Sequence, residues 1–301
     1  MTFHPDSLPD LTGKVYIVTG VATIPSLVSL SMAHTSTCAH ALTQKAKKAA
    51  SGIKERYPKV NISILEMDHT SLSAVVSAAK LFLSKETALH GLVNNAGIMA
   101  TPIEMTEDGY EAQWQTNYLA HWVFTSYLVP LMLNTSKGLP SGAVRIVNLS
   151  SSGHYQAPKG GINFADTSLP NEGGITRYGQ SKLGKHLPRQ NAAQKGEIWT
   201  AIVHPGFVDS QIGDRAEIPT LLRQFFSVFG ALGGRVDGDK GAWTSVFCVA
   251  SPDMKESQSG TYFQRTAEAG WQSRLAKDEK LAEKLEEWTK EEMRKGGWVG
   301  Q

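Results

Sequence analysis

The chain has 301 residues, of which 41% are hydrophobic and 19% are charged, a balance typical of a folded globular protein. Its formal net charge is only +2 and no long basic run stands out, so the electrostatic footprint of a nucleic-acid-binding protein is absent. Two cysteines, Cys38 and Cys248, are too few for a disulfide framework or a structural zinc site. We therefore expect no metal centre and no nucleic-acid partner.

The amino-terminal segment, residues 1–11, contains two aspartates and two prolines and lacks the apolar stretch of a signal peptide. No apolar run approaches the roughly 20 residues that are needed to cross a bilayer. The low cysteine content fits a reducing compartment. These features predict a cytoplasmic protein without a membrane span.

Short apolar strands alternate with helical segments along the chain. We expect strands at residues 15–18, 39–43, 61–67, 89–93, 144–149 and 199–203. We expect helices at residues 26–34, 45–57, 72–84, 107–132, 178–194 and 240–250. This alternation indicates βαβ units with right-handed crossovers. The sequence predicts an α/β fold, a Rossmann-like doubly wound parallel sheet with helices on both faces, formed by residues 1–301 as a single domain.

Three segments lie outside this alternation. Residues 154–176 are rich in glycine and proline and predict a loop over the sheet edge. Residues 206–238 contain an apolar piece at 221–232, which is either a packed surface helix or part of a lid over an apolar substrate. Residues 277–295 predict a charged amphipathic helix at the carboxyl terminus.

Tyr178 and Lys182 are one helical turn apart and share a helix face. A free tyrosine has a pKa of about 10, and a neighbouring ammonium favours the phenolate and lowers that pKa. Such a pair can exchange a proton with a carbonyl or alcohol oxygen. Alone, the spacing also fits a half-buried tyrosine beside a solvated lysine. Ser151 adds weight to the catalytic interpretation, because it closes a strand at the carboxyl edge, where open α/β sheets bind ligands.

Over about residues 11–263, a series of motifs resembles the short-chain dehydrogenase/reductase family in its order. The motifs are Thr19-Gly20, Asp68, Asn94-Asn95-Ala96-Gly97, Asn117, Ser151, Tyr178 with Lys182, and Pro205-Gly206. The segments at 181–183 and 204–208 are similar to the retinol-dehydrogenase-like branch and its fungal relatives. Each motif alone is weakly specific, but the ordered set indicates the family.

The resemblance implies a role for each of four catalytic positions. Tyr178 would be the general acid/base, Lys182 would tune it and hold the nicotinamide ribose, and Ser151 would bind the substrate oxygen. Asn117 would anchor a water that relays protons to Lys182. Besides Tyr178 and Lys182, the implied cofactor-binding residues are Gly20, Ile24, Asp68, Asn95, Ala96, Gly97, Pro205, Gly206 and Val208. The resemblance also implies a homodimer or homotetramer.

The glycine-rich loop departs from the family's Thr-Gly-x-x-x-Gly-x-Gly pattern. Ile24 and Ser26 occupy the positions of the second and third glycines. The β-branched side chain of Ile24 would enter space that the diphosphate shares, and it resists the positive φ that glycine adopts. Pro25 removes a backbone donor, although proline is tolerated at the first position of a helix, whose amino terminus still attracts an anion.

The expected end of the second strand also differs from the family pattern. Gln44 occupies the position where members that use NADP often carry an arginine and members that use NAD carry an aspartate. Lys45, Lys47 and Lys48 are the nearby cations, and no acid is available for a ribose hydroxyl. If a nicotinamide cofactor binds, the sequence therefore favours NADP.

Three functions remain open. The first is an NADP-dependent oxidoreductase that acts on a ketone, an aldehyde or a secondary alcohol of an apolar small molecule. The second is a cofactor-independent isomerase, dehydratase or cyclase, for which fungal secondary metabolism would be a natural setting. It rests on Ile24, Pro25, Ser26 and Gln44. The third is a non-catalytic binding protein. His154 and Tyr155 are further candidates to face a substrate, although a histidine is often simply a satisfied polar residue.

Overall fold

The computed structural model describes most of the chain, including all the motifs named above except the glycine-rich loop beyond Gly20 and the residues around Gln44. The described residues are 3–20, 33–37, 47, 50–52, 54–55, 61–187, 197–208, 212, 216, 236–264 and 267–299. Ile24, Pro25, Ser26 and Gln44 lie outside them, as does most of the expected lid at 206–238, including the piece at 221–232.

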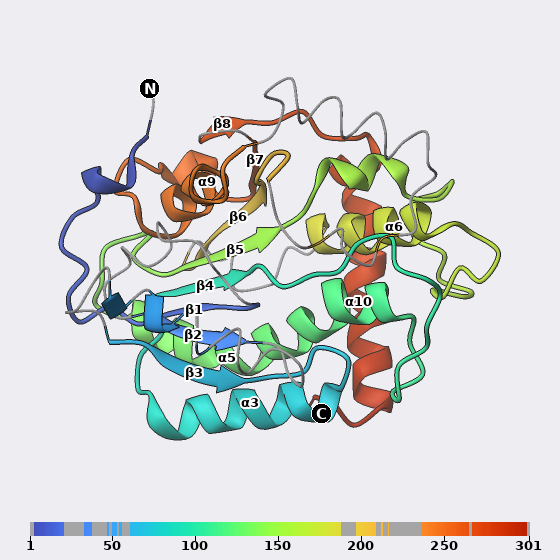
Figure 1. The fold of residues 1–301 in the computed structure, drawn as a ribbon, viewed down its shortest axis with the longest axis horizontal. Helices are drawn as coiled ribbons and strands as arrows, with labels where there is room; N and C mark the ends of the chain where they lie inside the picture. The colour runs from blue at the N-terminus through green and yellow to red at the C-terminus, as the bar shows by residue number, and fades with distance from the viewer. Residues whose placement is uncertain are drawn as a thin grey trace.

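A central sheet organises the described residues, with strands in the order β3-β2-β1-β4-β5-β6-β7-β8 (Figure 1). The strands are β1 (Tyr16–Val18), β2 (Ala33–Thr37), β3 (Ser63–Glu66), β4 (Gly91–Asn94), β5 (Arg145–Leu149), β6 (Trp199–His204), β7 (Thr261–Gln264) and β8 (Glu268–Ala269). Neighbouring strands are parallel except β7 and β8, which are antiparallel. The order reverses between β1 and β4, which is the switch point of a doubly wound sheet. The predicted fold class is confirmed.

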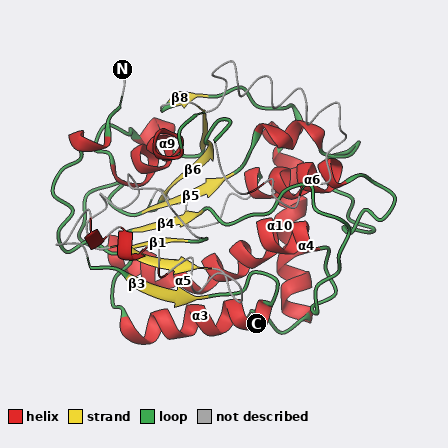
Figure 2. Cartoon of the chain, in the orientation of Figure 1, coloured by secondary structure: helices red, strands yellow, loops and turns green. Residues whose placement is uncertain are grey.

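Helices surround the sheet (Figure 2). The α-helices are α3 (Leu72–Lys85), α4 (Ala112–Trp114), α5 (Ala120–Ser136), α6 (Gly174–His186), α9 (Gly238–Ala250) and α10 (Glu279–Lys295). Successive strand residues face opposite sides, so Ile17 and Leu92 pack with α3, α5 and α10, whereas Val18 and Val93 pack with α9. Each face of the sheet therefore has its own apolar core. None of the described helices combines the length and the apolarity that membrane crossing requires.

The second strand differs most from its prediction. We expected a helix at 26–34 and a strand at 39–43, but β2 runs from Ala33 to Thr37, paired with β1 on one side and β3 on the other. The sequence of β2, AHTST, lacks an apolar run, and its main-chain partners rather than its hydrophobicity define it. Gln44 therefore does not directly follow this strand, and the preference for NADP loses that part of its basis.

Other predictions needed smaller corrections. The helix expected at 107–132 is not one regular α-helix. A π turn, Gln115–Leu119, separates α4 from α5. The helix expected at 178–194 begins earlier, at Gly174, and ends at His186. Strands β7 and β8 were not predicted. Both are short, and β7 extends the sheet beyond β6 through parallel pairing that only the folded chain supplies.

The carboxyl-terminal helix α10 is amphipathic, as predicted, and docks on the core beneath α5. Leu281, Leu285 and Met293 are buried in the same core as α3 and α5. The hydroxyl groups of Tyr118 and Thr289 lie 2.7 Å apart in the buried interface. Since Thr289 donates its own proton to the carbonyl of Leu285 at 2.7 Å, the Tyr118 hydroxyl is the donor. One buried polar contact thus fixes α10 against the π turn.

Replacing Thr289 with valine should destabilise the protein. The substitution keeps the shape but leaves the buried Tyr118 hydroxyl without its acceptor, which costs about 1–3 kcal/mol. Urea denaturation followed by circular dichroism would measure the loss. The double variant Tyr118→Phe/Thr289→Val should recover part of it, because neither unsatisfied group remains. A Thr289→Val protein as stable as the parent would contradict this role of the contact.

Candidate active site

The predicted site residues converge at the carboxyl edge of the sheet. Ser151 follows β5, Gly97 follows β4 and Gly206 follows β6, while α6 brings Tyr178 and Lys182 to the same edge. The arrowheads of β4 and β5 point toward α6 in Figure 1. Helix α6 lies against the short 3-10 helix η3 (Ser152–Gln156), and Ser151 is the N-cap of η3. This edge of a doubly wound sheet is where ligands bind.

Ser151 and Tyr178 come together at Gly153, which has no side chain to separate them. The backbone N–H of Gly153 donates to Ser151 Oγ at 3.0 Å. A Cβ on Gly153 would lie 2.6 Å from Tyr178 Cε1 and 3.3 Å from Ser151 Oγ. Only a residue without a side chain therefore lets the phenol ring approach the serine. Since Ser151 Oγ accepts from Gly153, its own proton points to another acceptor, and Tyr178 is such a partner.

The electrostatics of the pair differ from the sequence-based expectation. We expected the Lys182 ammonium to lower the pKa of Tyr178. Burial instead raises the pKa of Tyr178 to about 12, an effect that the interaction with the Ser151 hydroxyl only partly opposes. Lys182 Nζ lies 5.6 Å from the centre of the phenol ring, and burial lowers its own pKa to about 8. The phenol is therefore protonated at neutral pH.

Asn117 connects the turn after β4 to helix α6. Its Oδ1 accepts from the backbone N–H of Ile98 at 2.9 Å, and its Nδ2 donates to the Ile98 carbonyl at 2.9 Å and to Ser181 Oγ at 2.8 Å. Lys182 Nζ donates to the carbonyl of Leu149 at 3.1 Å. A Cβ on Gly97 would be 2.9 Å from Asn117 Oδ1 and 3.2 Å from Lys182 Nζ. The amide and the ammonium are therefore held in close contact with the Gly97 backbone.

The π turn places Asn117 in this position. It spans Gln115–Leu119, and residues in such turns often serve functional sites because the extra residue shifts a side chain off the regular helix face. The side chain of Asn117 is completely buried, and its backbone carbonyl contacts His121 Nδ1 at 3.2 Å. The amide thus fixes the turn after β4, while the implied water relay to Lys182 remains a prediction.

The turns after β1 and β4 are joined by a hydroxyl and an amide. Thr19 Oγ1 accepts from the backbone N–H groups of Asn95 and Ala96 at 2.9 and 3.0 Å. Asn95 Nδ2 donates to the Thr19 carbonyl at 2.9 Å. Gly20 has a φ of +86°, and a Cβ there would lie 3.1 Å from Ala96 Cα. Small residues and a glycine-specific backbone conformation therefore form a close-packed floor at this junction.

The other predicted cofactor residues are spread along the same edge. Asp68, two residues beyond β3, accepts from the backbone N–H and the hydroxyl of Thr70 at 2.9 and 2.7 Å. After β6, Gly206 has a φ of +89°, and Val208 pairs with Val236 and packs on Gly241. Pro205 lies directly before Gly206. These residues follow the carboxyl ends of β3 and β6, and Ile24 lies outside the described residues.

A buried basic cluster, which was not predicted from the sequence, lies beside the junction of Thr19 and Ala96. Lys185 is 2% exposed, and its Nζ lies 3.5 Å from the Ala96 carbonyl and 3.4 Å from His121 Nδ1. The rings of His121 and His69 are 4.7 Å apart. Burial lowers the pKa of His69 to about 3. The available signal was the i, i+3 spacing of Lys182 and Lys185, which places both lysines on one helix face.

His154, a candidate to face a substrate, is buried and contacts the backbone of Ser151. It is 1% exposed, its Nδ1 contacts the Ser151 carbonyl at 2.6 Å, and its Nε2 accepts from the backbone N–H of Ser273 at 3.2 Å. The accepting Nε2 means that the proton resides on Nδ1 and is donated to Ser151. Tyr155, in contrast, is half exposed beside it.

The fold and this arrangement agree with the comparison to known proteins. The family model for short chain dehydrogenases matches residues 14–218, more than half of the chain. The chain therefore belongs to the short-chain dehydrogenase/reductase family, and it is an oxidoreductase of that family.

Individual relatives support the same assignment. The chain is 42% identical to the short-chain dehydrogenase/reductase drtF of Aspergillus calidoustus, with 97% of each chain covered. It is 30% identical to retinol dehydrogenase 12 of Mus musculus, covering 91% of this chain and 84% of that protein. The NADPH-bound carbonyl reductase from chicken fatty liver has a TM-score of 0.59 at 18% identity, covering 86% and 99% of the two chains, and shows the fold alone. The predicted similarity to the retinol-dehydrogenase-like branch and to fungal relatives is confirmed.

Proposed function

We propose that this protein interconverts an apolar ketone or aldehyde and its alcohol. It would use a nicotinamide cofactor, with NADPH preferred over NADH. The observation that carries the proposal is the meeting of Ser151, Tyr178 and Lys182 at the carboxyl edge of the sheet. NADPH is favoured because residues 33–54 contain four lysines and no acid that could bind a ribose 2′-hydroxyl.

The described residues fit a nicotinamide ribose. Gly20 and Gly97 keep the backbone compact at this edge, because a Cβ would lie 3.1 Å from Ala96 Cα at Gly20 and 2.9 Å from Asn117 Oδ1 at Gly97. Among the described residues, Lys182 Nζ has the Leu149 carbonyl as its hydrogen-bond acceptor, so N–H donors remain for ribose hydroxyls. The backbone of Asn95 and Ala96, which donates to Thr19 Oγ1, would contact the nicotinamide half of the cofactor. When bound, the cofactor supplies the hydride.

The protein's own groups would handle the oxygen of the substrate. The Ser151 hydroxyl, which already accepts from Gly153, would donate its proton in a hydrogen bond to the carbonyl oxygen. Tyr178 would deliver a proton to that oxygen as the alcohol forms, and it would accept the proton in the reverse direction. With a pKa of about 12 the phenol carries its proton at neutral pH, which is the form that the reductive direction requires. Lys182 would keep its positive charge close to the Tyr178 ring.

The two other functions considered from the sequence gain no support from the described residues. A cofactor-independent enzyme was suggested by Ile24, Pro25, Ser26 and Gln44, all of which lie outside the described residues. A non-catalytic binding protein would have no need for the buried pair of Tyr178 and Lys182, since burial of an ammonium and of a phenol costs stability.

Titration with NADPH and NADH tests the proposal, with the nicotinamide fluorescence as the readout. We expect saturable binding, tighter for NADPH, and NADPH oxidation when apolar ketones or aldehydes are added. Cyclohexanone and long-chain aldehydes are suitable first substrates, with a charged keto acid as the control. Failure of both cofactors to bind at millimolar concentration would reject the oxidoreductase mechanism and leave acid/base chemistry without redox as the better explanation.

A further inference from the structure

A second candidate site lies at the opposite, amino-terminal edge of the same sheet. Tyr16, Gly91, Arg145 and Trp199 are the first residues of β1, β4, β5 and β6, and they pair directly with one another across the sheet. Directly paired residues of parallel strands point to the same face. The row therefore places a phenol, an empty position, a guanidinium and an indole side by side, away from Tyr178 and Lys182.

Gly91 gives room to its neighbours in this row, which borders a pocket that is partly open to solvent. A Cβ on Gly91 would lie 2.4 Å from Tyr16 Cδ1 and 2.6 Å from Val249 Cγ2. The tyrosine ring therefore lies over the glycine and reaches toward Arg145. The resulting cavity has a volume of about 320 Å³, within the usual range of ligand pockets of about 300–1,000 Å³. Its apolar walls come from Leu11, Trp199, Val249, Pro252 and Met254.

Arg145 is a buried cation without an acidic partner among the described residues. It is 7% exposed, and it donates through Nε to the Gly142 carbonyl at 2.6 Å and through Nη1 to the Ser251 carbonyl at 2.8 Å. Its guanidinium stacks on Trp199, 5.2 Å from the ring centre. All its oxygen acceptors are neutral carbonyls, and Nη2 has no acceptor in the described part of the chain. Such a charge is costly unless an anion approaches it.

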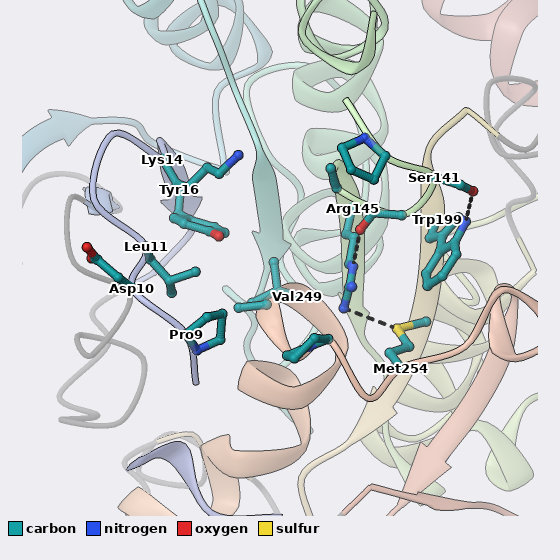
Figure 3. A pocket seen from close by; sticks show the side chains of 15 residues that line it. Pro9, Asp10, Leu11, Lys14, Tyr16, Ser141, Arg145, Trp199, Val249 and Met254 are labelled. Carbon is teal, nitrogen blue, oxygen red and sulfur yellow. Dashed lines mark hydrogen bonds between the residues drawn. The ribbon is translucent and has the colours of Figure 1, made fainter. Parts of the chain in front are cut away.

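Two further donors face the same cavity. The Tyr16 side chain is 4% exposed, and its hydroxyl has no hydrogen-bond partner among the described residues. Burial raises the pKa of Tyr16 to about 12, so the hydroxyl keeps its proton. Lys14 lines the rim, and Figure 3 shows it beside Tyr16, across the hollow from Arg145. Asp10 is the acidic residue that lines the same pocket. Its side chain is exposed and accepts hydrogen bonds from the backbone N–H and the hydroxyl of Thr12.

We propose that this cavity binds a small organic anion, a carboxylate on a compact apolar body. The carboxylate would receive hydrogen bonds from Arg145 Nη2 and from the Tyr16 hydroxyl, with the Lys14 ammonium nearby. The apolar body would lie against Leu11 and Val249. Binding would neutralise the buried guanidinium, and the site would not depend on the proposed active site.

Calorimetric titration with benzoate tests the proposal, and benzamide is the matched neutral probe. We expect benzoate to bind with one-to-one stoichiometry and benzamide to bind at least about tenfold more weakly, because it lacks the charge. Tyr16→Phe and Lys14→Gln should each weaken benzoate binding several-fold without changing the circular dichroism spectrum. Arg145 is left intact in these tests because its bonds to backbone carbonyls also support the fold.

Three results would overturn the proposal. Equal binding of benzoate and benzamide would show that the cavity recognises only the apolar body. Benzoate affinity unchanged in both variants would place the probe elsewhere. If inorganic phosphate displaced benzoate and bound more tightly, the cavity would be a site for an inorganic anion and not for an organic carboxylate. NADPH oxidation with an apolar ketone should stay unchanged in Tyr16→Phe, which separates this site from the proposed active site.

Discussion

A Tyr178→Phe variant should reduce apolar ketones with NADPH at least about a hundredfold more slowly than the parent protein, because the group that protonates the substrate oxygen is lost. The phenol is 6% exposed and lies close to Gly153, beside Ser151 Oγ, where it can reach the substrate oxygen that Ser151 would bind. Cofactor binding should persist, since the ring remains. Steady-state kinetics and NADPH fluorescence titration together measure these effects.

Tyr127→Phe is the matched control, because this tyrosine lies on α5 at the edge of the core and away from Ser151 and Lys182. Its turnover should equal that of the parent. The pH profile adds a second check. With a pKa of about 12 for Tyr178, alcohol oxidation in the parent should accelerate as the pH rises, because the phenolate is the base in that direction. If Tyr178→Phe retained parental turnover, Tyr178 would not be the acid, and the mechanism proposed here would have to be abandoned.

A Gly97→Ala variant should lower turnover by about a hundredfold and also destabilise the fold by about 1–3 kcal/mol. The new methyl group would lie 2.9 Å from Asn117 Oδ1 and 3.2 Å from Lys182 Nζ. Asn117 cannot yield easily, because its amide makes three hydrogen bonds to Ile98 and Ser181. The ammonium would therefore be displaced from its place below the phenol. Kinetics and thermal denaturation measure the two effects separately.

Gly238→Ala is the matched control for this substitution. Gly238 is the first residue of α9, and nothing lies within 4 Å of a Cβ placed there. Alanine favours a helix over glycine, so the control should be as stable as the parent or slightly more stable. If the Gly97→Ala protein had the same turnover and melting temperature as this control, the contacts between Gly97, Asn117 and Lys182 would not fix the position of the Lys182 ammonium.

Part of this protein's structure could be predicted from local pattern alone. The runs that became β3, β5 and β6 are apolar or β-branched, and their predicted bounds differ from the observed ones by only a few residues. The helix α3 was found because its apolar residues recur at helical spacing. The motifs around Ser151, Tyr178 and Lys182 were visible because residue type and chain order carry that information.

Elements defined by their neighbours were not predictable in this way. The polar strand β2 exists through main-chain pairing with β1 and β3, and β7 through pairing with β6. The burial of Lys185 beside His121 depends on residues distant in sequence, 64 positions apart. Long-range pairing and burial leave little trace in a short window of sequence, so pattern reading misplaced one strand and overlooked the basic cluster.

The sequence by itself determined the general alternation of strands and helices, the family motifs and the chemical types of the candidate catalytic groups, because these are properties of local composition and spacing. Only the tertiary structure decided the pKa values of these groups. Tyr178 is protonated and Lys182 has a lowered pKa because both are buried, and burial depends on how α6 packs against the turns after β4 and β5. The alignment of Tyr16, Gly91 and Arg145 across three strands likewise arose only from the register of the sheet.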